Sequence, residues 1–333
     1  MNFTAERVQI ENILRGHGYI SGPWRVSLYE RYDGAPIYVF SEEHNNAGNC
    51  ASQGLKSSHV TSVVHDILTQ TDHSHVLVEH FLHASEVVRD DVSVCSIAPP
   101  TGSLENLRSC LEVLMNPTVC KKCKDRIHFI DPRADIVCVL PDGNLFKAIT
   151  EYSVKCAASG NYSDAILVLY EALIHPLWSV LPDRKVLVGR LRGHFEEFFE
   201  KLPPDKKQQF DAMWKREISD QFSELLEIYN AMHTKFCMDR SGTLEDFKDA
   251  VEHILKTYKL FTNTFLDLWT LCVIDTIPKG EVSAILVYFG SLHGQNVERL
   301  LNDMDYGRQG FFTNGPKAVE EDPSANACIN MRQ

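Results

Sequence analysis

Residues 37–44 read Ile-Tyr-Val-Phe-Ser-Glu-Glu-His, four apolar residues followed directly by polar ones. A short, continuous apolar run of this kind is typical of a buried strand in a sheet that helices cover on both faces. In α/β proteins, functional groups gather at the carboxyl ends of such strands. The stretch therefore predicts an α/β fold and a candidate site that begins at Glu42 and His44, which point the same way in an extended chain.

Similar apolar runs occur elsewhere in the chain. They are residues 75–78, 127–130, 136–140 and 284–289. Segments with apolar residues at three- and four-residue steps, 56–71 and 104–114, lie between the earlier runs and predict amphipathic helices. Strands that alternate with helices predict a mostly parallel sheet flanked by helices.

A long helical region interrupts this pattern. Residues 144–277 contain no convincing strand and carry helical spacing, and Thr243 with Asp246 has the pattern of a helix-capping pair. Because the strand pattern returns at 284–289, we interpret the region as a large all-helical insertion into, or cap over, one α/β core. The expected organisation is an α/β core in 1–142, a helical insertion or cap in 143–280, a return strand and helix in 281–304, and an extended or mobile tail in 305–333.

The bulk composition limits the partners of the protein. The 333 residues carry a net charge of −12, which argues against binding to nucleic acid or to an anionic membrane surface. No apolar run approaches the ~18 residues of a membrane span. The first residues lack the pattern of a secretory signal, so we expect a cytoplasmic protein whose ten cysteines are mostly reduced, buried thiols.

Titratable side chains follow the ends of the predicted strands. They are Glu42 and His44, Glu79, Asp131 and Arg133, and His293. If the strands are parallel, these ends share one edge of the sheet, so side chains far apart in sequence converge in one crevice. A single polar residue after a strand is more often only a solvated loop residue, and the inference therefore depends on the whole set.

The same positions carry a resemblance to a known superfamily. Residues 39–46, Val-Phe-Ser-Glu-Glu-His-Asn-Asn, resemble the opening Gly-Glu-x-His motif of the ChaN, TraB/Tiki and erythromycin-esterase superfamily, with Ser41 in place of the glycine. Residues 76–79 resemble its second-strand glutamate motif, and 287–293 its terminal Gly-x-x-His strand. Residues 48–50 and 130–133 look more like uncharacterised members encoded by large DNA viruses, which would place the protein in the host cytoplasm or the virion.

Two hydrolytic mechanisms are consistent with these residues. In the first, Glu42, His44, Glu79, Asp131 and His293 supply ligands for a divalent Mn, Co or Zn ion, which generates hydroxide near neutral pH. In the second, His44 is a general base oriented by Glu42 or Glu79, and Arg133 or His293 stabilises developing negative charge. Both predict an esterase- or peptidase-like hydrolase acting on a small-molecule or peptide substrate.

Other interpretations remain open. Ser41 adds a Cβ where the superfamily has glycine, which favours a catalytically silent binding or structural protein, such as a virion component. Haem binding, which some members of the superfamily show, would use Tyr288 or His293 as axial ligand. The pair Cys120 and Cys123 is half of a zinc pattern, and its two intervening lysines would lower a thiol pKa.

Overall fold

The computed structural model describes residues 3–42, 57–81, 92–95, 103–133, 140, 143–179, 199–313 and 328–331. The chain divides into two compact units, one of Met1–Asp131 with Val273–Gln333 and one of Pro132–Cys272. The boundaries expected after residues 142 and 280 therefore fall later in the chain than the boundaries in the structure. The first unit is the α/β core, and the second is the helical region.

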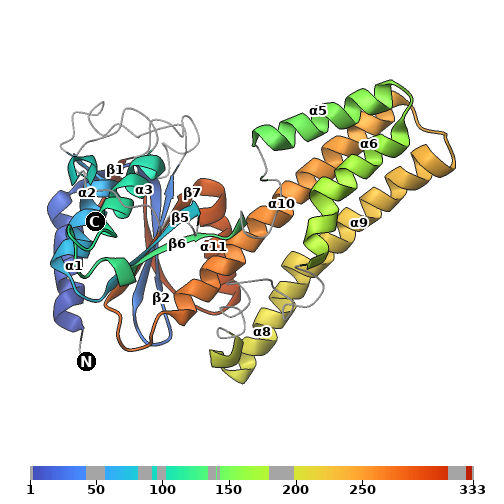
Figure 1. The fold of residues 1–333 in the computed structure, drawn as a ribbon. Helices are drawn as coiled ribbons and strands as arrows, with labels where there is room; N and C mark the ends of the chain where they lie inside the picture. The colour runs from blue at the N-terminus through green and yellow to red at the C-terminus, as the bar shows by residue number, and fades with distance from the viewer. Residues whose placement is uncertain are drawn as a thin grey trace. The chain divides into compact units, whose positions relative to one another are not determined.

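The core of the first unit is a six-stranded sheet with the order β6-β5-β7-β3-β2-β8. Its strands are β2 (Pro23–Glu30), β3 (Pro36–Glu42), β5 (Ser74–Phe81), β6 (Ile127–Asp131), β7 (Ala284–Gly290) and β8 (Gly307–Thr313). Neighbours among β6, β5, β7 and β3 are parallel, whereas β2 is antiparallel to β3 and β8. The predicted mostly parallel sheet is confirmed, and β7 lies between β5 and β3 (Figure 1).

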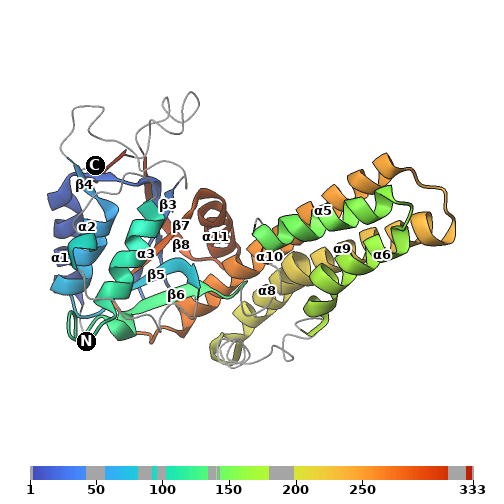
Figure 2. The ribbon, with the colours of Figure 1, turned by 45° about the horizontal axis from the view of Figure 1, so that its top comes forward.

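Helices cover both faces of this sheet (Figures 1 and 2). Helices α1 (Thr4–His17), α2 (Val60–Gln70) and α3 (Ser103–Leu114) share one apolar core with Phe40 and Val78. Helix α11 (Ser291–Asp303) contacts β3 and β7 on the other face. The predicted helix at 104–114 is confirmed, and the one at 56–71 is confirmed from Val60 to Gln70, whereas Ser57–His59 form a short strand. The periodic side chains of both helices, such as Ile67 and Leu111, are fully buried in this core.

The C-terminal segment differs from the extended or mobile tail expected over 305–333. Strand β8 pairs with β2, and β9 (Cys328–Asn330) pairs with β1 (Tyr19–Ser21) in a second sheet that also contains β4 (Ser57–His59). Backbone hydrogen bonds to an existing strand order these segments despite their glycine-rich, aperiodic sequence. The strand expected at 136–140 lies outside the described residues, except for Leu140.

The described residues of the second unit form helices and the turns that join them, without a strand. It contains α5 (Asn144–Ala158), α6 (Tyr162–Leu169), the π-helix η5 (Tyr170–Ile174), the 3-10 helix η6 (His175–Ser179), α8 (Pro204–Trp214), the π-helix η8 (Lys215–Ser219), α9 (Asp220–His233), the π-helix η9 (Thr234–Met238) and most of α10 (Leu244–Thr276). The predicted capping pair is confirmed, since Asp246 N donates to Thr243 Oγ1 at 3.2 Å and Thr243 N donates to Asp246 Oδ2 at 2.8 Å.

Four cysteines differ from the expectation of reduced thiols. Cys95 is bonded to Cys110, and Cys120 is bonded to Cys123. The first bridge joins the 3-10 helix η3 (Val92–Cys95) to α3, and the second closes a turn before β6. The first pair is brought together by the packing of η3 on α3, which the linear sequence did not reveal, whereas the second pair is only three residues apart in the chain. No helix in the described parts of the chain has both the length and the apolar character that crossing a bilayer requires.

Candidate functional site

The carboxyl ends of the parallel strands bring three predicted acids to one edge of the sheet. Glu42 ends β3, Glu79 lies near the end of β5, and Asp131 ends β6. All three residues are almost completely buried, with exposed fractions of 0%, 5% and 2%. A buried carboxylate requires hydrogen-bond donors or positive charge around it, so these acids mark a polar layer at the edge of an otherwise apolar core.

Glu79 lies beside His293 at this edge. Its Oε1 atom is 3.9 Å from Nε2 of His293, and its Oε2 atom accepts a hydrogen bond from the backbone N–H of Gly290 at 3.2 Å. His293 lies in the first turn of α11, which begins directly after β7, and is 5% exposed. The strand-to-helix turn after β7 therefore supplies both a donor that fixes the carboxylate and the imidazole that faces it.

Glu42 has a different set of partners. Its Oε1 atom accepts from the backbone N–H of Leu104 at 3.1 Å, in the first turn of α3, and its Oε2 atom accepts from the Tyr288 hydroxyl at 2.7 Å. A helix N-terminus favours negative charge, which helps to explain how this carboxylate is accommodated without exposure. Burial, and then the charge of Glu42, raise the pKa of Tyr288 well above its usual value, so the hydroxyl remains a donor.

The sheet separates these two acids. Glu42 follows Phe40 by two residues and shares its face, on the side of α3, whereas Glu79 follows Val78 by one residue and lies on the side of α11. The two glutamates thus approach the same strand end, at Gly290, from opposite faces. The single crevice expected from the sequence is therefore divided into two groups of polar side chains.

The remaining predicted residues are placed as follows. His44 lies outside the described residues, as do residues 43–56, which follow β3. Arg133 belongs to the helical unit, where its Nη1 atom donates to Oδ1 of Asn263 at 2.8 Å. Asp131 pairs with Phe81 in the register of β5 and β6, and its charge acts on His80, on the α3 side of the sheet.

The structure also contains a buried pair that sequence reasoning missed. Nε2 of His80 lies 2.9 Å from Oε1 of Glu112 in α3, and the side chains are only 17% and 6% exposed. Burial, as the largest cause, lowers the pKa of His80 despite this carboxylate. The linear sequence carries no clear signal for this pair, because the neighbours of Glu112 at helical spacing include the polar residues Arg108, Ser109 and Asn116.

Metal binding has limited support in the described residues. Among them, no group of three or more His, Cys, Asp or Glu side chains is arranged to hold a metal ion. Glu79 and His293 are donors of the right chemical type for Mn, Co or Zn, but a third ligand is needed to complete a site. His44 is the candidate that the sequence offers.

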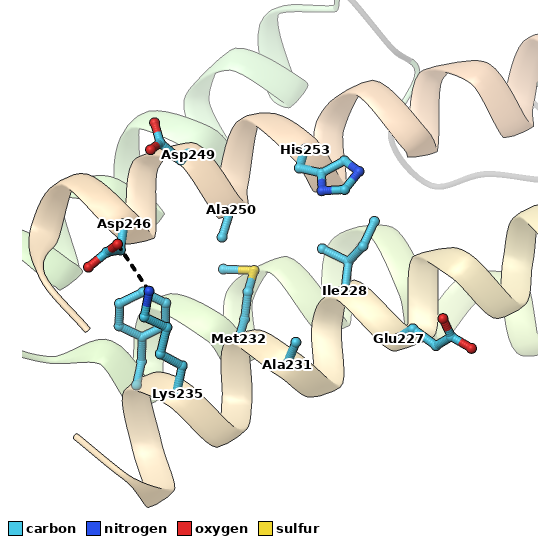
Figure 3. A pocket seen from close by; sticks show the side chains of 10 residues that line it. Glu227, Ile228, Ala231, Met232, Lys235, Asp246, Asp249, Ala250 and His253 are labelled. Atoms are coloured by element: carbon cyan, nitrogen blue, oxygen red, sulfur yellow. Dashed lines mark ion pairs between the residues drawn. The ribbon is translucent and has the colours of Figure 1, made fainter. Parts of the chain in front are cut away.

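A well-defined pocket lies in the helical unit, between α9 and α10 (Figure 3). Its volume is about 500 Å³, and its lining includes Ile228, Met232 and Ala250, with charged groups at the rim. Lys235 and Asp246 are joined across it by an ion pair of 3.0 Å. The pocket contains no nucleophile beside a base, so its geometry indicates packing or binding and not a reaction.

The fold and this edge define the protein as an α/β protein with a mostly parallel sheet, whose carboxyl edge carries buried carboxyl and imidazole groups. Comparison of the chain with protein-family models, curated proteins and solved structures found no match. The function is therefore argued from the residues themselves.

Proposed function

We infer that the protein is an esterase- or peptidase-like hydrolase that acts at the carboxyl edge of its sheet through His293 and Glu79. The observation that carries this proposal is the distance of 3.9 Å between His293 Nε2 and Glu79 Oε1, in a setting where both residues are 5% exposed. An imidazole held beside a buried carboxylate is the usual arrangement of a general base and the group that orients it.

The pair suits proton transfer from a water molecule. In this mechanism His293 accepts the proton, and the negative charge of Glu79 stabilises the imidazolium that forms. The Gly290 N–H holds the carboxylate in place, so only a small movement of the imidazole is needed for a direct hydrogen bond. Such contacts are commonly longer in the free enzyme than in the complex with substrate.

The metal-assisted version uses the same residues in other roles. His293 and Glu79 would be ligands together with His44, and a bound divalent ion would supply an activated water near neutral pH. In that version, too, the Gly290 N–H orients the carboxylate.

We further propose membership of the ChaN, TraB/Tiki and erythromycin-esterase superfamily. Support comes from the placement of Glu42, Glu79 and His293 at the ends of β3, β5 and β7, where the motifs of that superfamily have their acids and histidine. The departure at Ser41 is accommodated, because its side chain is fully buried against Gly294 of α11. The packing of Ser41 under α11 supports the hydrolase over the silent protein, for which a Cβ that obstructs the strand end was the main argument.

The test is a panel of ester and peptide substrates, applied to the full-length protein with and without added Mn, Co or Zn. We expect His293→Asn and Glu79→Gln each to lower kcat/KM about 10²–10⁴-fold, the usual contribution of general acid–base catalysis. The matched control is His253→Asn, which removes an imidazole that is 57% exposed in the helical unit and should leave activity unchanged.

Two results would contradict the proposal. Absence of turnover under every metal condition would favour the binding or structural protein instead. Loss of activity in His80→Asn with full activity in His293→Asn would move the reaction to the α3 side of the sheet. The metal content of the wild-type protein and of His44→Ala separates the two hydrolytic versions, since only the metal-assisted one predicts a bound ion that the substitution removes.

A further inference from the structure

Cys120 and Cys123 form a disulfide across a tight turn that the proposed hydrolase site does not use. Their Cα atoms are 5.5 Å apart, and Cys123 N donates to the carbonyl oxygen of Cys120 at 3.5 Å. Cys123 is fully buried, whereas Cys120 is partly exposed at the border of the apolar core. Cys120 is therefore the more accessible of the two residues to an approaching thiol.

The turn that presents Cys120 is held by its own backbone. The N–H groups of Cys120 and Val119 both donate to the carbonyl oxygen of Asn116, at 3.0 and 2.9 Å. Oδ1 of Asn116 accepts from the backbone N–H of Thr118 at 3.0 Å. Because these bonds do not involve the sulfurs, the turn keeps its geometry when the bridge opens.

A buried guanidinium lies next to the inner sulfur. Nη2 of Arg126 is 3.8 Å from Sγ of Cys123, and the same guanidinium donates to the carbonyl oxygens of Leu68 at 2.7 Å and Thr71 at 2.9 Å. These bonds fix the positive charge in the loop between α2 and β5. A fixed cation beside a sulfur stabilises its thiolate and so makes it a better leaving group.

We propose that Cys120 and Cys123 are a thiol–disulfide exchange site for a small thiol of the glutathione class. A thiolate attacks Sγ of Cys120, a new S–S bond forms there, the Cys120–Cys123 bond breaks, and its electron pair passes to Cys123 beside Arg126. A second thiol attacks the sulfur of the bound thiol and releases Cys120 as thiolate. Two small thiols are thereby oxidised to their disulfide, and the protein bridge is reduced to two thiols.

The bridge between Cys95 and Cys110 is the internal control. Both of its cysteines are buried, with exposed fractions of 4% and 0%, so neither sulfur presents a surface to an incoming thiol. Exchange rates depend on access as well as on thiolate stability. The two bridges in the same unit should therefore respond very differently to the same reductant.

The experiment exposes the oxidised full-length protein to reduced glutathione, quenches by alkylation at intervals, and identifies the labelled peptides by mass spectrometry. We expect the Cys120–Cys123 bridge to open at least about tenfold faster than the Cys95–Cys110 bridge. In Cys123→Ser, oxidised glutathione should accumulate as an adduct on Cys120. In Cys120→Ser, the buried Cys123 should remain largely unmodified.

Several results would overturn the proposal. Equal opening rates of the two bridges would show that exposure of the cysteine does not control the exchange. An adduct on Cys123 in preference to Cys120 would show that the thiol attacks the other sulfur. Two free thiols at 120 and 123 after treatment with oxidised glutathione would show that the bridge does not form. One zinc ion per chain that is lost in Cys120→Ser and Cys123→Ser would assign the pair to metal binding.

Discussion

Gly294 in α11 lies against Ser41 at the end of β3, so closely that a methyl group on its Cα would overlap the Ser41 hydroxyl. Rotation of the hydroxyl would still leave a tight contact, because Cβ of Ser41 would lie 3.0 Å from the added methyl carbon. The helix that carries His293 is thereby seated directly on the strand that ends in Glu42. The size of the residue at position 41 is coupled to the size of the residue at position 294.

This coupling predicts that Gly294→Ala destabilises the protein. Overpacking of a filled core costs about 1–3 kcal/mol, which exceeds the gain of up to about 1 kcal/mol from replacing a helical glycine. We expect the double variant Ser41→Gly/Gly294→Ala to recover most of the loss. Urea denaturation of the wild type, the two single variants and the double variant forms a complete cycle, and simple additivity would contradict the coupling.

Tyr288→Phe tests the hydrogen bond to Glu42. Both residues are buried, at 1% and 0% exposure, and the substitution removes the donor at 2.7 Å from Glu42 Oε2. Loss of a donor to a buried charged acceptor should lower the free energy of unfolding by about 1–3 kcal/mol. Tyr152→Phe is the matched control, because Tyr152 is 55% exposed in the helical unit and its substitution should leave the unfolding transition unchanged.

The sheet could be predicted from the sequence because its parallel strands are covered on both faces. Continuous apolar runs such as residues 284–289 are typical of strands that are buried on both faces. Strand β8 could not be predicted in the same way, since its sequence Gly-Arg-Gln-Gly-Phe-Phe-Thr has little periodicity and its order comes from hydrogen bonds to β2. A local sequence pattern does not predict pairing with a strand that lies more than 270 residues away in the chain.

Because both faces of the sheet are apolar, the division of the site into two groups of side chains could not be predicted from the sequence. Acids at strand ends could be predicted from position alone, but the face on which each lies depends on alternation along the strand. Where both faces are apolar, the sequence gives no mark of which face belongs to α3 and which to α11. Glu42 and Glu79 therefore looked equivalent in the sequence, whereas in the structure only Glu79 lies beside His293.

The ion pair between Arg31 and Asp33 should make the stability of the first unit sensitive to acid. The Arg31 side chain is fully buried and donates from Nε and Nη2 to the two carboxylate oxygens of Asp33, at 2.8 and 2.6 Å. Although burial opposes it, the Arg31 bonds and charge lower the pKa of Asp33 to about 2. A lowered carboxyl pKa gives stability that is present above its ordinary value of 3.8 and is lost as pH falls towards 2.

Asp33→Asn should therefore destabilise the protein at neutral pH, by about 3 kcal/mol or more, because it leaves a buried guanidinium without its counter-charge. The loss should shrink as pH falls from about 4 towards 2, because the unfolded wild-type chain binds a proton at Asp33 in this range before the folded protein does. Unfolding curves of both proteins between pH 2 and 7 measure this convergence. Asp72→Asn is the control, since its ion pair with Lys122 is exposed and should contribute little at any pH.

Protonation of His59 should cause a second pH dependence of stability, at higher pH than that of Asp33. It caps α2, where its Nδ1 atom accepts from the backbone N–H of Thr61 at 3.2 Å, and burial lowers its pKa to about 4. A histidine whose pKa is lowered is neutral in the folded protein, so the unfolded state binds an additional proton below pH 6.5. Stability from this residue is complete above pH 6.5 and is lost as pH falls towards 4.

The replacement His59→Asn isolates this contribution, because asparagine retains a side-chain acceptor suited to a helix N-cap but does not titrate. We expect the free energy of unfolding of the wild type, relative to the variant, to fall by about 1 kcal/mol per pH unit between pH 6 and pH 4. Above pH 7 the difference between the two proteins should be constant. Parallel curves for the two proteins over the whole range from pH 4 to 8 would show that folding does not change the pKa of His59, contrary to the effect of its burial beside Thr61.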